Sequence, residues 1–98
     1  MHEITLIVKY FIKDGMLNEF LAVLKNNGFP EVVQSENGCI EYSYFVPAFG
    51  KENVVVLIEK WESEKLQKAH LDTPHMQNMK TFKDSFVEKT TVEIFNEG

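Results

Sequence analysis

The sequence contains no arginine, only one cysteine, and no apolar run near the roughly 20 residues that a membrane-spanning helix needs. All 10 basic residues are lysines scattered along the chain, and 15 acidic residues outnumber them, which gives a net charge of -5. Nucleic-acid-binding proteins gather their basic residues into patches, so nucleic acid and anionic membranes are unexpected partners. Because Cys39 is alone, no intrachain disulfide can form.

Several functional motifs are also missing. The chain has no glycine-rich phosphate loop and no Ser/His/Asp set spaced for nucleophilic catalysis. Its first residues lack the basic segment and cleavage site of a secretion signal, so we expect a cytoplasmic protein. Without repeats or linkers, residues 1–98 should form one domain. A domain of this size buries only about two-thirds of its unfolded surface, so a large internal cavity would favour oligomerisation.

The alternation of apolar residues predicts strands over residues 3–13, 39–46, 54–61 and 91–95. Between the first two strands, helical spacing begins at Leu17, breaks at Gly28 and Pro30, and continues as a short second helix. After the third strand, Ser63 caps a helix that stops and restarts at Asp72-Thr73-Pro74 and runs to about Lys89. The remaining segment, 47–53, suits an open hairpin loop.

This order of elements predicts an α+β fold, a ferredoxin-like split βαβ sandwich with a four-stranded antiparallel sheet. Helices would cover one face of the sheet, and the other face should then be polar in a monomer. The third strand is instead apolar on both sides, because Val54, Val56 and Ile58 alternate with other apolar residues. We therefore predict a homodimer in which a second sheet covers this face.

The stretch from Val54 to His75 holds the single tryptophan and two of the three histidines. Glu59 and Trp61 should point to the same side of their strand, because side chains alternate faces. A carboxylate beside a tryptophan on an apolar face fits either a core residue with a rim carboxylate or the wall of a pocket.

Three segments resemble the antibiotic biosynthesis monooxygenase domain family. They are Lys13-Asp14-Gly15 before a Leu/Phe-rich helix, Gly38-Cys39-Ile40-Glu41-Tyr42, and Glu59-Lys60-Trp61-Glu62-Ser63 followed by His70 and Thr73-Pro74-His75. The resemblance implies a dimeric α/β barrel with a pocket between sheet and helices in each chain. The family includes cofactor-free quinol and anthrone oxygenases, a haem-degrading branch and a branch that processes phosphorylated autoinducer-2. The Gly28-Phe29-Pro30 break departs from the family's usual uninterrupted first helix.

Within this framework we take His70, Glu59 and Trp61 as candidate catalytic residues, and His75, Tyr42, Tyr44 and Met79 as candidate substrate-binding residues. Each has a structural alternative. From spacing alone, the position of His70 near a helix end favours a structural role. Cross-strand packing explains Tyr42 and Tyr44 equally well, and methionines such as Met79 and the small Cys39 commonly pack in cores.

The sequence argues against a metal site, because the spacing of His70 and His75 crosses a helix break and no carboxylate follows at a ligand interval. It also argues against haem, since the haem-degrading branch has a histidine where this chain has Met79. We therefore expect no cofactor.

The expected function is oxygenation of a small aromatic or quinol substrate by O2, with His70 as the base. Glu59 would orient His70 or stabilise its protonated form, and Trp61 would stack on the ring or donate its indole N–H to a developing oxyanion. His75 is the reserve base. Two alternatives remain open. One is an isomerase acting on a phosphorylated metabolite, which the absence of arginine disfavours. The other is a non-catalytic binding protein.

Overall fold

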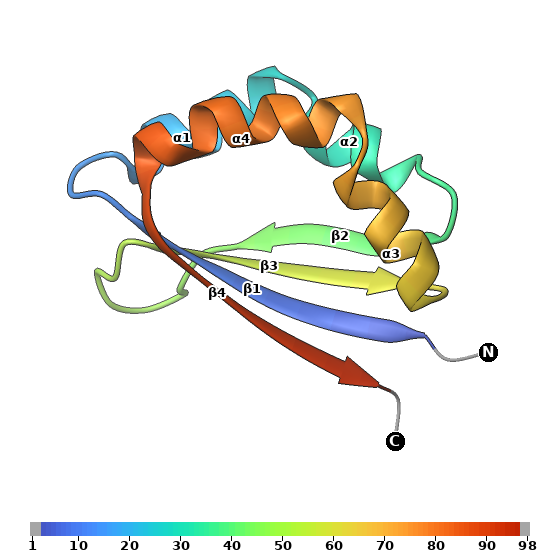
Figure 1. The fold of residues 1–98 in the computed structure, drawn as a ribbon. Coiled ribbons are helices and arrows are strands. Elements are labelled where there is room, and N and C mark those ends of the chain that lie inside the picture. The colour runs from blue at the N-terminus through green and yellow to red at the C-terminus, as the bar shows by residue number, and fades with distance from the viewer. Residues whose placement is uncertain (1–2, 97–98) are drawn as a thin grey trace.

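Within residues 3–96, which the computed structural model describes, four antiparallel strands form one sheet in the order β2-β3-β1-β4 (Figure 1). The strands are β1 (Ile4–Ile12), β2 (Cys39–Phe45), β3 (Val54–Trp61) and β4 (Val87–Asn96). The helices α1 (Leu17–Asn26), α2 (Phe29–Gln34), α3 (Glu64–Leu71) and α4 (Pro74–Phe86) all lie over one face of the sheet. The predicted ferredoxin-like α+β fold is confirmed.

The helix boundaries follow the predicted signals. Gly28 takes a backbone φ of +62° between α1 and α2, a conformation that glycine adopts without steric cost, and Pro30 lies in the first turn of α2. The side chains of Ser63 and Thr73 accept backbone N–H bonds at the starts of α3 and α4. No helix in the described part of the chain is both long and apolar enough to cross a membrane.

The last helix ends earlier than predicted. We expected helix to about Lys89, but α4 stops at Phe86 and β4 begins at once with Val87. Pairing of Val87 with Ile12 and of Lys89 with Phe11 draws this segment into the sheet, and the backbone N–H of Lys13 donates to the Phe86 carbonyl. Smaller differences occur at strand ends, since Glu3, Lys13 and Val46 lie outside the strands.

The core lies between the sheet and the helices. Alternate residues of β1 point into it, from Ile4 to Ile12, while the residues between them are more exposed. The core side of β3 carries Val55, Leu57, Glu59 and Trp61, which are all buried, so the predicted alternation of this strand is confirmed. A carboxylate and a tryptophan therefore face the helix layer together.

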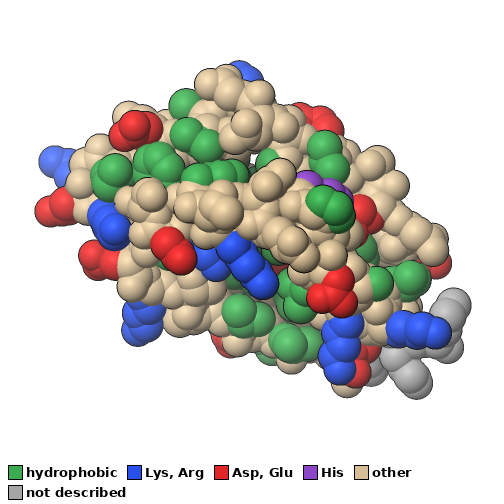
Figure 2. Space-filling view, turned by 45° about the horizontal axis from the view of Figure 1, so that its top comes forward, with side chains coloured by type: hydrophobic (Ala, Val, Ile, Leu, Met, Phe, Trp, Pro, Cys, Tyr) green, Lys and Arg blue, Asp and Glu red, His purple; other side chains and the backbone are tan. Residues whose placement is uncertain are grey.

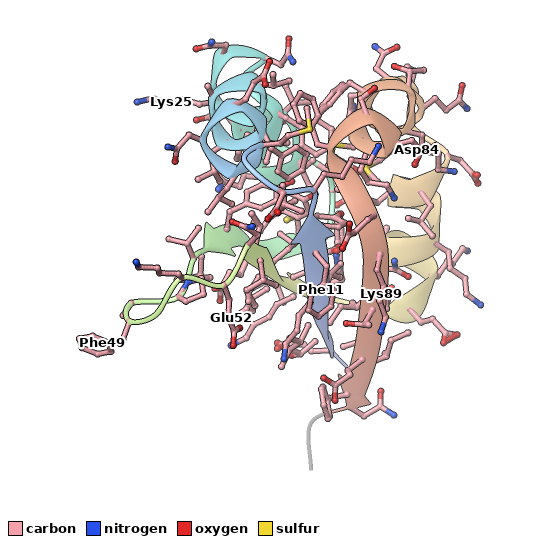
Figure 3. All side chains as sticks on the ribbon, turned by 90° about the vertical axis from the view of Figure 1, so that its left-hand side faces the viewer. Phe11, Lys25, Phe49, Glu52, Asp84 and Lys89 are labelled. Carbon is pink, nitrogen blue, oxygen red and sulfur yellow. The ribbon has the colours of Figure 1, made fainter. Side chains whose placement is uncertain are left out.

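The second face of the sheet carries no other described element (Figures 1 and 3), and it mixes apolar side chains with polar and charged ones. The cross-strand register places Ser43, Ile58, Ile7 and Glu93 in one row and Phe45, Val56, Lys9 and Thr91 in the next. Val54, which we expected on this face, is already buried in the chain itself, with 5% exposure. Phe49 lies at the tip of the loop between β2 and β3. It is 93% exposed and projects away from the body of the protein (Figure 3).

Candidate functional site

A cavity of about 400 Å³, here called the main cavity, lies between the sheet and helices α3 and α4. Apolar and aromatic side chains of β1, β4, α3 and α4 form most of its wall, including Leu6, Val8, Tyr10, Leu71, Met76, Met79, Val92 and Ile94. Its polar lining comes from Tyr42, Glu59, Gln67, Lys68, Lys80, Lys83 and Thr90. A mostly apolar cavity of this size, with a few polar groups, suits a small organic ligand.

Glu59 is the titratable acid in this wall. Its side chain accepts a hydrogen bond from the Trp61 indole N–H at 3.0 Å, and both residues are buried. Burial raises the pKa of Glu59, while the Trp61 hydrogen bond and the nearby His70 partly oppose the rise. A carboxyl with a raised pKa beside an apolar cavity has the properties of a general acid or base.

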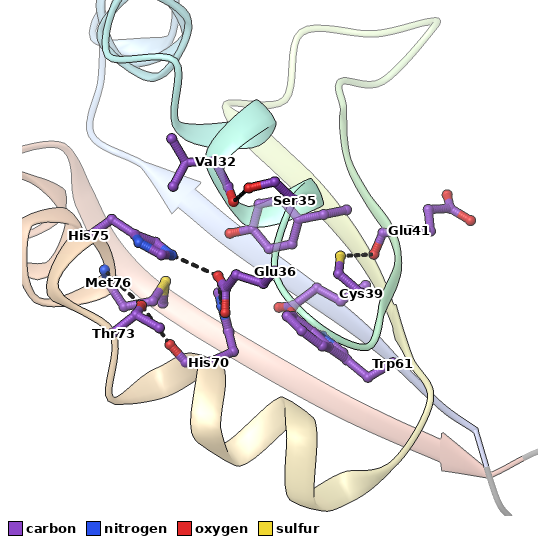
Figure 4. Close-up of polar contacts among 12 residues, drawn as sticks. Val32, Ser35, Glu36, Cys39, Glu41, Trp61, His70, Thr73, His75 and Met76 are labelled. Atoms are coloured by element: carbon purple, nitrogen blue, oxygen red, sulfur yellow. Dashed lines mark hydrogen bonds and ion pairs between the residues drawn. The ribbon is translucent and has the colours of Figure 1, made fainter.

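Behind this wall, one carboxylate bridges two histidines (Figure 4). Oε2 of Glu36 lies 2.7 Å from Nδ1 of His70 and 2.6 Å from Nε2 of His75. The His70 side chain is 1% exposed, that of Glu36 14% and that of His75 25%, so the network runs from the core to the surface. The His70 ring packs 4.7 Å from the Trp61 ring, centroid to centroid.

The network's protonation pattern follows from its geometry. An ionised carboxylate only accepts hydrogen bonds, so both histidine nitrogens that face Glu36 must carry a proton. In the neutral state, His70 is then the Nδ1–H tautomer and His75 the Nε2–H tautomer. This leaves Nε2 of His70 and Nδ1 of His75 as the ring nitrogens that can accept a further proton.

Three local features bring this network together. Thr73 Oγ1 donates to the His70 carbonyl at 2.8 Å and caps α4 at the backbone N–H of Met76, so it fixes the corner between the two histidines. Gly38 follows Glu36 with φ of +84°. A Cβ atom there would lie 2.4 Å from the Leu66 side chain on α3. Glycine therefore lets the Glu36 loop approach α3.

The sequence argument against a metal site considered only carboxylates that follow the histidines at a ligand interval, whereas the structure brings Glu36, from earlier in the chain, beside both histidines. Their ligand atoms and that of Glu36 lie within 4.8 Å of one another, and two histidines with a carboxylate can bind a divalent metal. Ligand atoms bound tetrahedrally to zinc at about 2.0–2.1 Å would lie about 3.3 Å apart. The contacts of 2.7 and 2.6 Å are shorter, as in hydrogen bonds, and an ion would have to spread these groups.

The predicted site residues fall into two groups. Glu59, Tyr42 and Met79 line the main cavity. His70 and Trp61 are packed behind it, with 1% and 0% exposure. His75 instead lines a second hollow of about 300 Å³ beside α2 and α4, with Phe29 and Asn78.

Tyr44 lies beside Tyr42 rather than in the described cavity lining, and the two hydroxyl groups are 3.1 Å apart. Burial raises the pKa of both tyrosines, so they act as neutral hydrogen-bonding groups. Cys39 is only partly buried, and burial together with Glu36 and Glu59 raises its pKa to about 11, which makes it a poor nucleophile at neutral pH.

Sequence reasoning missed Glu36, which is the carboxylate bonded to His70 in place of the expected Glu59. Glu36 is separated from the two histidines by 34 and 39 residues, so no spacing within one helix or strand could reveal the contact. One signal was available. Glu36 lies two residues before Gly38, just before strand β2, and β2 pairs with β3, which carries Glu59 and Trp61.

Comparison with known proteins gives a family and a fold. The family profile described as antibiotic biosynthesis monooxygenase matches residues 3–81. A search of curated protein sequences gave no match.

Solved structures similar to this chain include a conserved protein from Methanosarcina mazei Go1, with 21% identity, TM-score 0.87 and coverage of 100% of this chain and 95% of that one. Another, described as an antibiotic biosynthesis monooxygenase, has 22% identity, TM-score 0.83 and coverage of 97% and 98%. A protein from Bacteroides thetaiotaomicron described as a "Possible Oxidoreductase" has 20% identity, TM-score 0.83 and coverage of 98% of each chain. At these identities the likeness shows the shared fold alone.

Proposed function

The chain belongs to the antibiotic biosynthesis monooxygenase family, and we propose that it oxygenates a small aromatic or quinol substrate in the main cavity without a metal, flavin or haem cofactor. The observation that carries this proposal is the buried carboxyl of Glu59 in the wall of a mostly apolar cavity. The buried part of the cavity wall limits the water around a bound anion, and Glu59 offers a base there.

The proposed chemistry uses the substrate as its own reductant. A neutral phenol reacts slowly with O2, whereas the anion left by proton removal can donate an electron. In the balanced reaction of a hydroquinone, one oxygen atom is inserted at a ring carbon and the other leaves as water, so that one hydroquinone and one dioxygen give one hydroxyquinone and one water. The substrate supplies all the electrons, and the protein supplies a base and a shaped cavity.

In our proposal Glu59 removes the substrate's hydroxyl proton, and the Trp61 indole N–H holds the carboxylate in position. This revises the expected roles, in which His70 was the base and Trp61 contacted the ring, because Glu59 lines the cavity whereas His70 and Trp61 lie behind it. His70 becomes a positioning residue that packs on the Trp61 ring and, when it is protonated, favours the ionised form of Glu59. Its Nε2 keeps it a second candidate for the base.

The test is oxygen uptake by purified protein with a panel of hydroquinones, naphthoquinols and anthrones, corrected for uncatalysed autoxidation and repeated with EDTA. We expect turnover that resists the chelator and needs no added flavin or iron. Glu59→Gln should reduce kcat by roughly 10²- to 10⁴-fold, the usual contribution of a general base. If His70→Gln abolished turnover while Glu59→Gln did not, His70 would be the base. A requirement for added metal or flavin would refute the cofactor-free mechanism.

We further propose that the protein is a homodimer whose two sheets face each other through the second face. The argument is the register that aligns Ile58 with Ile7 and Val56 with Phe45 on a face that carries no other described element. Clustered apolar side chains on an open sheet face commonly mark a protein–protein contact. A second copy offers the same surface by symmetry.

A further inference from the structure

Three of the ten lysines gather around the main cavity. Lys68 on α3 and Lys80 and Lys83 on α4 all belong to its lining, although the protein as a whole carries net charge -5. Glu59 is the acidic residue in the described part of this lining. Figure 2 shows lysine side chains in the middle of one face of the molecule, directly beside hydrophobic side chains.

Other hollows on the described surface differ in charge. The hollow of about 520 Å³ near the start of β3 is lined by Asp14, Glu52 and Glu88 and by no lysine. The hollow beside His75 is lined by amide, hydroxyl and apolar side chains. Among these three hollows of the described residues, lysines therefore line the main cavity and neither of the other two.

The cavity-facing stripe of α4 changes character along the helix. Met76 and Met79 come first, then Lys80 and Lys83 follow at the three- and four-residue spacings that keep side chains on one side of a helix. Met79 is fully buried, Lys83 is half-buried and Lys80 is exposed. A ligand along this stripe would meet apolar surface at one part and cationic groups at another.

The lysine charges differ in how far they are already paired. Lys68 lies 3.5 Å from Glu64 in an exposed ion pair within α3. The ammonium of Lys83 lies 5.6 Å from the ring centroid of Tyr10, a cavity-lining residue, which holds the charge over the cavity wall. Lys80 and Lys83 are therefore the stronger candidates for contact with an anion.

We infer that the substrate of the main cavity is an aromatic or quinol that carries a carboxylate, which Lys80 and Lys83 bind at the rim while its ring lies over Met79 and its hydroxyl group faces Glu59. This inference rests on the proposed function. Lysine is a mobile point charge rather than a bidentate fork, so it suits a carboxylate whose angle is not strictly fixed. In an acidic protein the local cations also offset repulsion of an anionic ligand.

Matched substrate pairs test the inference in the oxygen-uptake assay. We would compare 1,4-dihydroxy-2-naphthoate with 1,4-dihydroxynaphthalene, and 2,5-dihydroxybenzoate with hydroquinone, after subtracting autoxidation. The wild type should show a higher kcat/KM for the carboxylated member of each pair, and added NaCl should narrow the difference because salt screens exposed charges.

The variant test uses Lys80→Gln/Lys83→Gln, with Lys25→Gln/Lys65→Gln as a control that removes the same charge away from the cavity. KM for the carboxylated substrates should rise roughly tenfold or more in the cavity variant, the effect of losing one charge-assisted contact. The rise should be much smaller for the neutral substrates. The control should retain wild-type KM values, and circular dichroism melting curves should show that both variants are folded.

Two results would overturn the inference while the proposed function survives. These are turnover with equal kcat/KM for neutral and carboxylated substrates, and equal KM changes in the cavity and control variants. If no substrate consumed oxygen, calorimetric binding of 1-hydroxy-2-naphthoate that weakened only in the cavity variant would uphold the anion site and refute the oxygenase. Tighter binding of phenyl phosphate than of benzoate would show that the anionic group of the ligand is a phosphate and not a carboxylate.

Discussion

Glu59 combines burial, an opening onto the main cavity and a hydrogen bond from Trp61. Because burial raises its pKa in the folded protein, the unfolded chain loses this proton at lower pH than the folded protein does. Ionisation of Glu59 therefore lowers the free energy of unfolding as the pH rises above the usual glutamate value, and the loss is complete above the folded pKa. The proposed base therefore lowers the stability of the folded protein at neutral pH.

The first prediction follows from this sign. Glu59→Gln should raise the melting temperature at pH 7 to 8, because glutamine can still accept the Trp61 bond without a buried charge. The gain should shrink as the pH falls towards the usual glutamate value and be small near pH 4, where most of the wild-type carboxyl is protonated in both states. Melting curves from pH 4 to 8 would measure it, with the exposed Glu62→Gln as the control. A gain that did not depend on pH would contradict the assignment.

The second prediction concerns Glu36. Glu36→Gln keeps the size of the side chain but removes the ionised acceptor shared by His70 and His75. The loss should destabilise the fold by about 1 to 3 kcal/mol, the usual cost of removing one partner of a buried charged hydrogen bond. Nitrogen NMR should show the Nδ1–H tautomer of His70 and the Nε2–H tautomer of His75 when the imidazoles of the wild type are neutral. The tautomers should differ in the variant.

A purely structural role for Glu36 would lower stability without changing the pH profile of oxygen uptake. A role in holding His70 should shift that profile as well. Unchanged imidazole signals in Glu36→Gln would show that the hydrogen bonds to Glu36 do not set the tautomers. A rise in melting temperature on addition of Zn²⁺, lost in the variant, would instead indicate that the three groups open to bind a metal.

The sequence predicted the site only where local periodicity determines geometry. Alternation in β3 places Glu59 and Trp61 on one face, and the structure agrees. The sequence could not show that His70 lies behind the cavity wall. Helical spacing indicates which side of α3 carries His70, but it does not indicate which element packs against that side. The contacts of Glu36 could not be predicted for a related reason, because they depend on how the loop before β2 approaches α3.

At the scale of elements, capping residues and turns were the most reliable signals, and the end of α4 was the least. Glu88 and Lys89 favour a helix in isolation, but β1 offers backbone partners to the whole segment from Val87 onward. Tertiary pairing overrode local propensity there. The result is a ten-residue β4 that contributes Thr90 to the lining of the main cavity, in addition to Val92 and Ile94, which the shorter predicted strand already contained.

The third prediction tests the close approach of the loop before β2 to α3. Gly38→Ala would force an alanine into a positive φ and press its Cβ against Leu66. Gly50→Ala is a matched control, because Gly50 also has a positive φ, of +90°, but has no atom within 4 Å of an added Cβ. In the control, backbone strain alone should lower the free energy of unfolding by about 1 to 2 kcal/mol. Gly38→Ala should lower it by clearly more.

Thermal melts would compare the two variants, with about 4 to 8 °C expected per kcal/mol for a domain of this size. Gly38→Ala should also lower oxygen uptake, because moving α3 away from the loop separates His70 from Glu36. Equal melting temperatures for the two variants would mean that Leu66 yields without cost and that the contact does not fix the loop.

At the scale of the whole molecule, the two faces of the sheet differ in what covers them. The helix-covered face encloses the core and the main cavity, whereas the second face presents Ile7, Val56 and Ile58 to whatever lies outside the chain. The ammonium of Lys89 lies 5.6 Å from the ring centroid of Phe11, so part of this surface is covered by a lysine side chain. Most of the apolar side chains on this face have no such cover among the described residues.

The last prediction tests the second face as a dimer interface. Val56→Lys places a charge between Phe45 and Lys9 in the middle of this face, where a second sheet would bury it without a partner. Light scattering at micromolar concentration should give twice the monomer mass of 11.4 kDa for the wild type and a shift towards monomer or loss of fold for the variant. Phe49→Lys is the control, because it adds the same charge at the 93% exposed loop tip and should leave the mass unchanged. A wild-type monomer, or a Val56→Lys protein with unchanged mass and melting temperature, would show that this face does not pair.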